Sequence, residues 1–136
     1  MIDTILRNTK EYVLKNNKNS RKCKGQFFTP VSIAEFMAQR AAYATQHLSI
    51  LEPGAGNGLL TASIVKFCIE NALCTSFDIK LVENDADVME LLRDTIIAIT
   101  KYVNENNGYI NISLSTENYI TGSEDGEYDI VHSHEL

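Results

Sequence analysis

Proline and cysteine are scarce in this sequence, and each shortage excludes a class of protein. The 136 residues include two prolines and seven glycines, so no segment has the composition of a low-complexity linker. The three cysteines, Cys23, Cys68 and Cys74, form no pair with the spacing of a zinc site or a disulfide framework. We therefore expect reduced, buried or half-buried thiols, no metal centre and a cytoplasmic location.

Long apolar runs are also missing from the chain. No run approaches the roughly 20 residues that are needed to cross a membrane. The first residues lack the layout of a secretion signal. Hydrophobic residues nevertheless make up 44% of the chain, which is enough to form the core of one domain. The sequence therefore predicts a single domain that does not contact a membrane.

Positive charge is in deficit overall and is concentrated near the N-terminus. The net charge is −6, which is the wrong sign for a chain held on nucleic acid by charge alone. Seven of the twelve lysines and arginines lie in the first 24 residues: Arg7, Lys10, Lys15, Lys18, Arg21, Lys22 and Lys24. This cluster is either the solvated surface of a helix and a loop, or a strip beside a phosphate backbone.

Helical and strand-like patterns alternate along the chain. Helices are expected at residues 3–16, 30–45, 59–71 and 85–104, and strands at 47–52, 77–83, 109–114 and 128–132. This alternation predicts an α/β, Rossmann-like fold in which helices cover both faces of a parallel sheet of about four strands. A helix and a basic loop, residues 1–24, would precede the domain at residues 25–136. Ligands bind at the carboxyl ends of such strands.

A glycine-rich turn stands where the first strand enters its helix. The segment reads Glu52-Pro53-Gly54-Ala55-Gly56-Asn57-Gly58. Glycines let a turn adopt positive φ and let a ligand approach the backbone. The dinucleotide pattern is not matched, because Leu59 occupies the place of its last glycine. An acid before the turn would repel a pyrophosphate but suits the ammonium group of an amino acid, so Glu52 favours a ligand with a cationic end.

A second acid ends the next strand, in the segment Glu83-Asn84-Asp85. A carboxylate at this place can accept both hydroxyls of a ribose. Asn84 can cover or hydrogen-bond the edge of an adenine, whereas Asp85 is better explained as the N-cap of the following helix. Glu52, Glu83 and the glycine turn together predict a pocket for S-adenosylmethionine. Each acid alone could be an ordinary residue at a strand end.

The residues upstream of the turn carry a family resemblance. They read Gly25-Gln26-Phe27-Phe28-Thr29-Pro30. This segment resembles the motif that precedes the glycine turn in adenine-N6 DNA methyltransferases of restriction–modification systems. The turn itself resembles the next motif of that family, and the gap of roughly 20 residues between them matches. The resemblance covers about residues 25–131 and implies a class I methyltransferase fold, S-adenosylmethionine as cofactor and double-stranded DNA as substrate.

The resemblance also implies roles for individual residues. Phe27 or Phe28 would close over the cofactor, or pack in the core, and the segment at Thr29 would hold the methionine carboxylate. The implied cofactor-binding residues are Phe28, Thr29, Pro30, Glu52, Pro53, Gly54, Ala55, Gly56, Asn57, Gly58, Glu83, Asn84, Asn118 and Tyr119. Where the family has an acid after its third strand, this sequence has Asn118-Tyr119-Ile120. Asn118 could still accept a hydrogen bond from the adenine amino group.

The catalytic motif of this family, which is like Asn-Pro-Pro-Tyr, is expected after the fourth strand. Its oxygens would accept hydrogen bonds from the amino group of an adenine flipped out of the duplex, and its ring would stack on the base. Pro30 and Pro53 are the only prolines, so no such motif occurs. His134, Glu135 and Leu136 stand at its place and do not match it. We expect the chain alone to transfer no methyl group to DNA.

Two other functions stay open. The chain could be a catalytically inactive cofactor-binding or scaffold module, and a partner chain would then supply the missing half with its target-recognition domain. An unpaired sheet edge beyond the fourth strand would favour that arrangement. The chain could also belong to a methyltransferase that acts on RNA or protein, although such enzymes usually lack the segment at residues 25–30.

Overall fold

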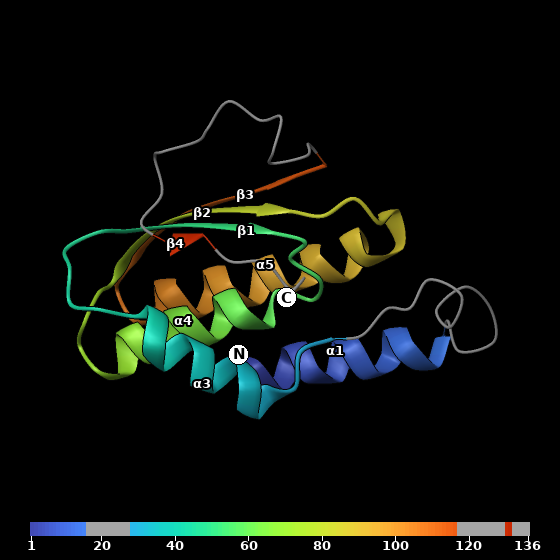
Figure 1. The fold of residues 1–136 in the computed structure, drawn as a ribbon, viewed down its shortest axis with the longest axis horizontal. Coiled ribbons are helices and arrows are strands. Elements are labelled where there is room, and N and C mark those ends of the chain that lie inside the picture. Colours follow the sequence, from blue (N-terminus) through green and yellow to red (C-terminus); the bar gives the residue numbers. More distant parts are fainter. Residues whose placement is uncertain (16–27, 117–129, 132–136) are drawn as a thin grey trace.

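The computed structural model describes residues 1–15, 28–116 and 130–131, in which a layer of helices packs against a parallel sheet (Figure 1). The helices are α1 (Ile2–Lys15), α3 (Val31–Ala41), α4 (Leu59–Glu70) and α5 (Ala86–Glu105). The strands are β1 (Leu48–Pro53), β2 (Ser76–Val82), β3 (Tyr109–Ser115) and β4 (Ile130–Val131). Each described element lies within a few residues of a segment that the sequence pattern predicts.

The sheet has the strand order β3-β2-β1-β4, and every pair of neighbours is parallel. Helix α4 connects β1 to β2 and α5 connects β2 to β3, so both crossovers run in the same direction along the sheet. This arrangement confirms the α/β, Rossmann-like prediction. The register pairs Pro53 with Val82, so the chain leaves β1 and β2 at the same level. Residues that follow these two strands are therefore neighbours in space.

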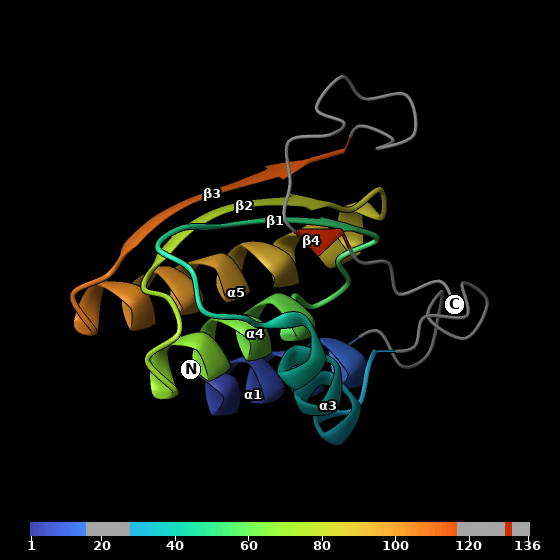
Figure 2. The ribbon, with the colours of Figure 1, turned by 60° about the vertical axis from the view of Figure 1, so that its left-hand side comes forward.

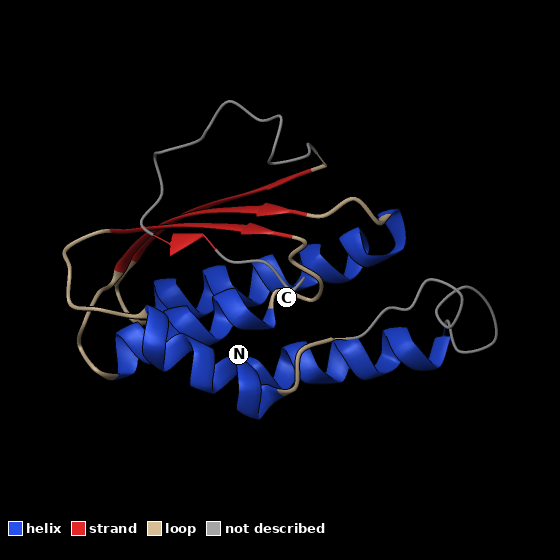
Figure 3. Ribbon diagram, in the orientation of Figure 1, coloured by secondary structure: helices blue, strands red, loops and turns tan. Residues whose placement is uncertain are grey.

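The described helices all lie on one face of the sheet (Figures 2 and 3). The sequence pattern predicts helices on both faces, and for the described helices that prediction is wrong. The reason lies in β2, where half-buried Ser76, Asp78 and Lys80 alternate with the buried Phe77 and Ile79. Strands buried on both faces have near-continuous apolar runs, whereas alternation is typical of a sheet with one solvated face.

Polar contacts join neighbouring strands on this open face. Asn111 of β3 donates a hydrogen bond to Asp78 of β2 at 3.1 Å. The ring of His47, just before β1, lies 2.8 Å from the hydroxyl of Ser76 and also contacts the ring of Tyr109. The open face is thus held by hydrogen bonds between exposed side chains, and the apolar core lies between the sheet and the helices.

Helix α1 belongs to this core. Ile5 is fully buried among residues of the sheet and of the other helices, and α1 contacts both α4 and α5. Thr9, which the periodicity places on the inner side of the helix, is half-buried. The first 15 residues therefore pack as part of the domain, although the sequence analysis sets residues 1–24 apart from it.

The start and the end of α3 differ from the expected bounds. Pro30 is the N-cap, with φ −60° and ψ 150°, rather than the first helical residue, and its carbonyl accepts from the N–H groups of Ile33 and Ala34. The helix ends at Ala41 instead of continuing to Thr45, because Ala42 adopts an extended conformation with ψ 143°. The later start follows from the extended ψ of Pro30, which leaves Val31 as the first helical residue.

The close approach of the turn to α5 gives a testable prediction for stability. Gly58 has φ +76°, and an added Cβ would lie 2.7 Å from Cγ2 of Thr95 and 2.9 Å from Cδ1 of Leu92. Gly58→Ala combines a left-handed backbone with overpacking, so we expect it to lower the free energy of unfolding by about 2–4 kcal/mol. Urea denaturation measures this change.

Gly54→Ala is the matched control for that substitution. Gly54 has φ +64°, but no heavy atom lies within 4 Å of the position of an added Cβ. Only the backbone penalty then applies, and a loss of about 1–2 kcal/mol is expected. Equal losses in the two variants would contradict the close contact between Gly58 and α5.

Candidate functional site

The candidate site begins with the turn that follows β1. Gly54, Gly56 and Gly58 have φ values of +64°, +60° and +76°, a region that residues with a Cβ rarely adopt. The N–H of Ala55 donates to the carbonyl of Val82 at 3.0 Å, which ties the turn to the end of β2. The alternate glycines are therefore required by the backbone, as the sequence analysis argues.

Burial divides the residues of the turn into two groups. Gly54 is exposed and Gly56 is half-buried, so a ligand can reach the backbone at these two residues. The other five residues are buried: Glu52, Pro53, Ala55, Asn57 and Gly58. All seven are expected from the sequence to bind the cofactor, and the structure leaves two of them accessible and buries the other five.

Glu83 is the acid that follows β2, and it faces the turn. Its Oε1 accepts a hydrogen bond from the N–H of Gly56 at 2.9 Å, and its Oε2 accepts from the N–H of Asp85 at 3.0 Å. The side chain is half-buried. A carboxylate offers about four lone-pair sites, so two remain for hydroxyl donors of a ligand. The structure thus brings the second acid and the glycine turn together.

The residues after Glu83 have separate roles. Asp85 is the N-cap of α5, as predicted, and its side chain accepts from the N–H of Asp87 at 2.9 Å. Asn84 lies between these two acids and is exposed. Its side chain is therefore accessible at the carboxyl end of β2, next to the carboxylate of Glu83.

Glu52 is buried beneath the turn. Only 1% of the residue is exposed, and its Oε1 accepts a hydrogen bond from the hydroxyl of Thr61, in the first turn of α4. A negative charge at this end of a helix is favourable, because the free N–H groups there have a partial positive charge. Glu52 therefore anchors the start of α4 directly behind the turn.

The segment before α3 is described only from Phe28 onwards. The ring of Phe28 contacts the ring of Tyr12 edge to face, with 6.0 Å between centroids, so this side chain packs on α1. Thr29 is half-buried and Pro30 is exposed. The other site residues expected from the sequence lie outside the described residues: Phe27, Asn118, Tyr119, His134, Glu135 and Leu136.

Three threonines contact the site without having been assigned to it from the sequence. Thr61 donates to Glu52, Thr95 donates to the carbonyl of Asn57 at 2.7 Å, and Thr9 accepts from the side chain of Asn57 at 3.1 Å. Each is a polar residue on the inner side of a helix. Such a residue must find a buried hydrogen-bond partner, and that requirement is the signal that sequence reasoning could have used.

The described cysteines take no part in this site. Cys68 and Cys74 are buried and free, as expected, and Cys23 lies outside the described residues. Burial, and to a smaller extent the proximity of Cys74, raises the pKa of the Cys68 thiol to about 11. The thiolate is the reactive form, so this thiol is inert near neutral pH.

The described residues contain neither a candidate membrane span nor a candidate metal cluster. None of the helices there is long and apolar enough to cross a membrane. Groups of three or more His, Cys, Asp or Glu side chains that could hold a metal ion are also absent from these ranges.

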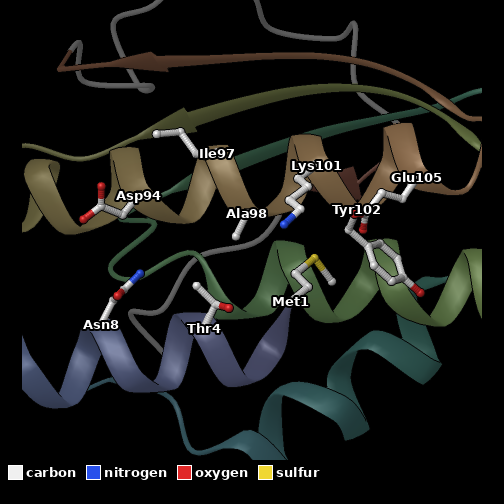
Figure 4. Close-up of a pocket in the computed structure, with 9 residues that line it drawn as sticks. All are labelled: Met1, Thr4, Asn8, Asp94, Ile97, Ala98, Lys101, Tyr102 and Glu105. Atoms are coloured by element: carbon white, nitrogen blue, oxygen red, sulfur yellow. The ribbon is translucent and has the colours of Figure 1, made fainter.

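A groove of about 470 Å³ lies between α1 and α5 (Figure 4). Its lining consists of Met1, Thr4, Asn8, Asp94, Ile97, Ala98, Lys101, Tyr102 and Glu105. The groove follows the two helices and includes no residue of the turn or of the strand ends. It is therefore separate from the candidate site.

Comparison with known proteins identifies a family. The model of the N-6 DNA methylase family matches residues 2–117. The fold is similar to that of a type I restriction-modification system methyltransferase subunit from Streptococcus thermophilus, with a TM-score of 0.61 and 18% sequence identity. The alignment covers 79% of this chain and 22% of that one. No curated protein matches the sequence.

Other solved structures share the fold at similar identity. A protein described as a class I S-adenosylmethionine-dependent methyltransferase from Listeria monocytogenes aligns with a TM-score of 0.57 and 16% identity, over 84% of this chain and 35% of that one. Precorrin-6y C5,15-methyltransferase from Geobacter metallireducens aligns with a TM-score of 0.51 and 15% identity, over 73% and 46%. The chain thus spans less than half the length of each of these three proteins.

The contact between Glu52 and Thr61 gives a second prediction. Thr61→Val keeps the shape of the side chain but removes the donor to a buried carboxylate, so we expect the free energy of unfolding to fall by about 1–3 kcal/mol. Thr61→Ser retains the hydroxyl and serves as the control. Thermal or urea unfolding of the three proteins measures the difference, and a serine variant as unstable as the valine variant would contradict the role of the hydroxyl.

Proposed function

The chain belongs to the N-6 DNA methylase family, and from this premise we propose that it contributes the S-adenosylmethionine site of an enzyme that methylates N6 of adenine in DNA. The observation that carries the proposal is the meeting of Glu83 with the accessible part of the glycine turn, at Gly54 and Gly56, where β1 and β2 end side by side. Such strand ends are where α/β sheets bind nucleosides.

The residues at this edge fit the proposed cofactor. The absence of atoms within 4 Å of the Cβ position of Gly54 leaves room for a ligand over the turn. Glu83 is held by two backbone N–H groups, so its carboxylate is oriented before a ligand arrives. Its remaining lone pairs suit the two hydroxyls of a ribose. The exposed amide of Asn84, one residue further on, suits the edge of an adenine.

The methionine end of the cofactor would lie toward the start of α3. Helix N-termini bind anions through free N–H groups, which suits a carboxylate near Thr29 and Pro30. The buried charge of Glu52 would favour the ammonium group from behind the turn. When bound, the cofactor supplies an electrophilic methyl group on its sulfonium. The residues of this chain bind and orient that cofactor.

The proposed substrate is an adenine in double-stranded DNA, within a restriction–modification system. Family membership supports this choice over RNA or protein. An adenine must leave the base stack before its amino group can reach a methyl donor. The residues that would hold the flipped base are not identified in this sequence, so we propose that residues outside this chain, in a longer protein or in a partner subunit, hold it.

A second candidate function is a cofactor-binding or scaffold module that works with another chain. The type I relative is itself a subunit of a system. The strand order places β4 at an edge of the described sheet, where a further strand could pair. In this arrangement the partner would provide the target recognition and the acceptor site, and this chain would provide the cofactor.

Cofactor binding is tested by calorimetric titration with S-adenosylmethionine. We expect the chain to bind and Glu83→Ala to weaken the affinity by about 10- to 100-fold, because the ribose loses charge-assisted hydrogen bonds. Asp78→Ala, which removes a carboxylate from β2, the strand that Glu83 follows, is the control and should bind like the unmodified chain. A Glu83→Ala variant that binds equally well would contradict the assignment of the ribose site.

Methyl transfer is tested with the same cofactor carrying a labelled methyl group and with adenine-containing duplex DNA. We expect no label in the DNA when the chain is used alone, because its sequence contains no Pro-Pro pair that could form the acceptor motif. Cofactor binding is measured in the same buffer, so that a lack of transfer is not confused with a lack of binding. Labelled N6-methyladenine in the product would refute the expectation.

A further inference from the structure

Asn57 joins the glycine turn to three helices. Its side-chain NH2 donates to the hydroxyl of Thr9 on α1 at 3.1 Å, and its Oδ1 accepts from the N–H of Leu59 at the start of α4 at 3.2 Å. Its backbone carbonyl accepts from the hydroxyl of Thr95 on α5 at 2.7 Å. Only 1% of Asn57 is exposed. The residue between the last two glycines is therefore fixed from three directions.

The direction of these hydrogen bonds makes the residue types specific. The hydroxyl of Thr9 donates to the carbonyl of Ile5 at 2.7 Å, so its oxygen is left to accept from Asn57. Asn57 must therefore donate toward α1 and accept toward α4, which an amide does with its two ends. An aspartate lacks the donor and a serine is too short to reach both partners.

The packing of α1 does not by itself fix its position along α5. Ile5 is buried, but apolar burial is not directional. The groove between the helices, with Thr4 and Asn8 on one side and Asp94 and Ala98 on the other, shows that side chains do not fill this interface (Figure 4). The hydrogen bond between Thr9 and Asn57 is a directional contact, and it fixes the position of α1 relative to the turn.

We propose that Thr9 is a positioning residue for the cofactor site, which acts through Asn57 on the conformation of the glycine turn. The backbone of Gly56 is one residue from Asn57 and is bonded to Glu83. A turn that loses its link to α1 therefore loosens at the point where the ribose-binding acid is attached. The effect of Thr9 on cofactor affinity rests on the proposed function. Its effect on the conformation of the turn is expected in the chain without ligand as well.

The test compares the same substitution at two threonines of α1. Thr9→Val removes the acceptor for Asn57, whereas Thr4→Val changes a hydroxyl that lines the groove away from the turn. Hydrogen–deuterium exchange is measured at the amides of residues 56–59 without cofactor. We expect about tenfold faster exchange in Thr9→Val, near the unmodified rate in Thr4→Val, and restoration of slow exchange in Thr9→Ser. If Thr9→Val does not fold, Thr9→Ala replaces it.

Cofactor affinity provides the second readout, by titration of the same variants. If the population of the turn in its binding-competent conformation falls to about one-tenth, the apparent Kd for the cofactor rises by about tenfold. Equal exchange in the two valine variants, or an unchanged Kd in Thr9→Val while the unmodified chain binds, would overturn the positioning role. A failure of the unmodified chain to bind cofactor would instead count against the proposed function, and the exchange rates would still decide the role of Thr9.

Discussion

The parallel register of β1 and β2 is the constraint on which the site depends. Because Pro53 lies opposite Val82, the chain leaves both strands at one level, and the N–H of Ala55 reaches the carbonyl of Val82. A shift of one residue would reverse the faces of β2 and bury its polar side chains. The same register brings Glu83 to the N–H of Gly56. Strand pairing, the turn and the acid are thus one geometric unit.

Polar residues of the helices form hydrogen bonds with the turn and the end of β1 from the helical side of the sheet. Thr61 on α4, Thr95 on α5 and Thr9 on α1 each direct a hydroxyl toward the turn or the strand end. A hydroxyl left without a hydrogen-bond partner in the interior would be destabilising. Each of these three hydrogen bonds therefore also specifies how its helix lies against the sheet. Apolar contacts drive the helices onto the sheet, and the hydroxyls select one arrangement among those that apolar packing allows.

The sequence predicts most of the fold, since hydrophobic periodicity reports which residues a helix or strand buries. It also predicts that Glu83 and the glycine turn meet, because parallel strands end at the same edge. It does not separate the exposed Gly54 from the buried Asn57, as both lie in one motif and differ only in which neighbouring element covers them. The ends of α3 escape prediction for a similar reason, because alanine is compatible with helix and with extended chain at Ala42.

The alternation of polar and apolar residues along β2 gives the two faces of this strand different tolerance to substitution. Substitutions at inward positions such as Phe77 and Ile79 disturb the layer that supports the turn. Substitutions at Asp78 or Asn111 change only contacts on the solvated face. Related chains can therefore diverge in the charge and hydrogen-bonding pattern of that face while the geometry at the strand ends stays the same, so surface character and ligand binding can evolve independently.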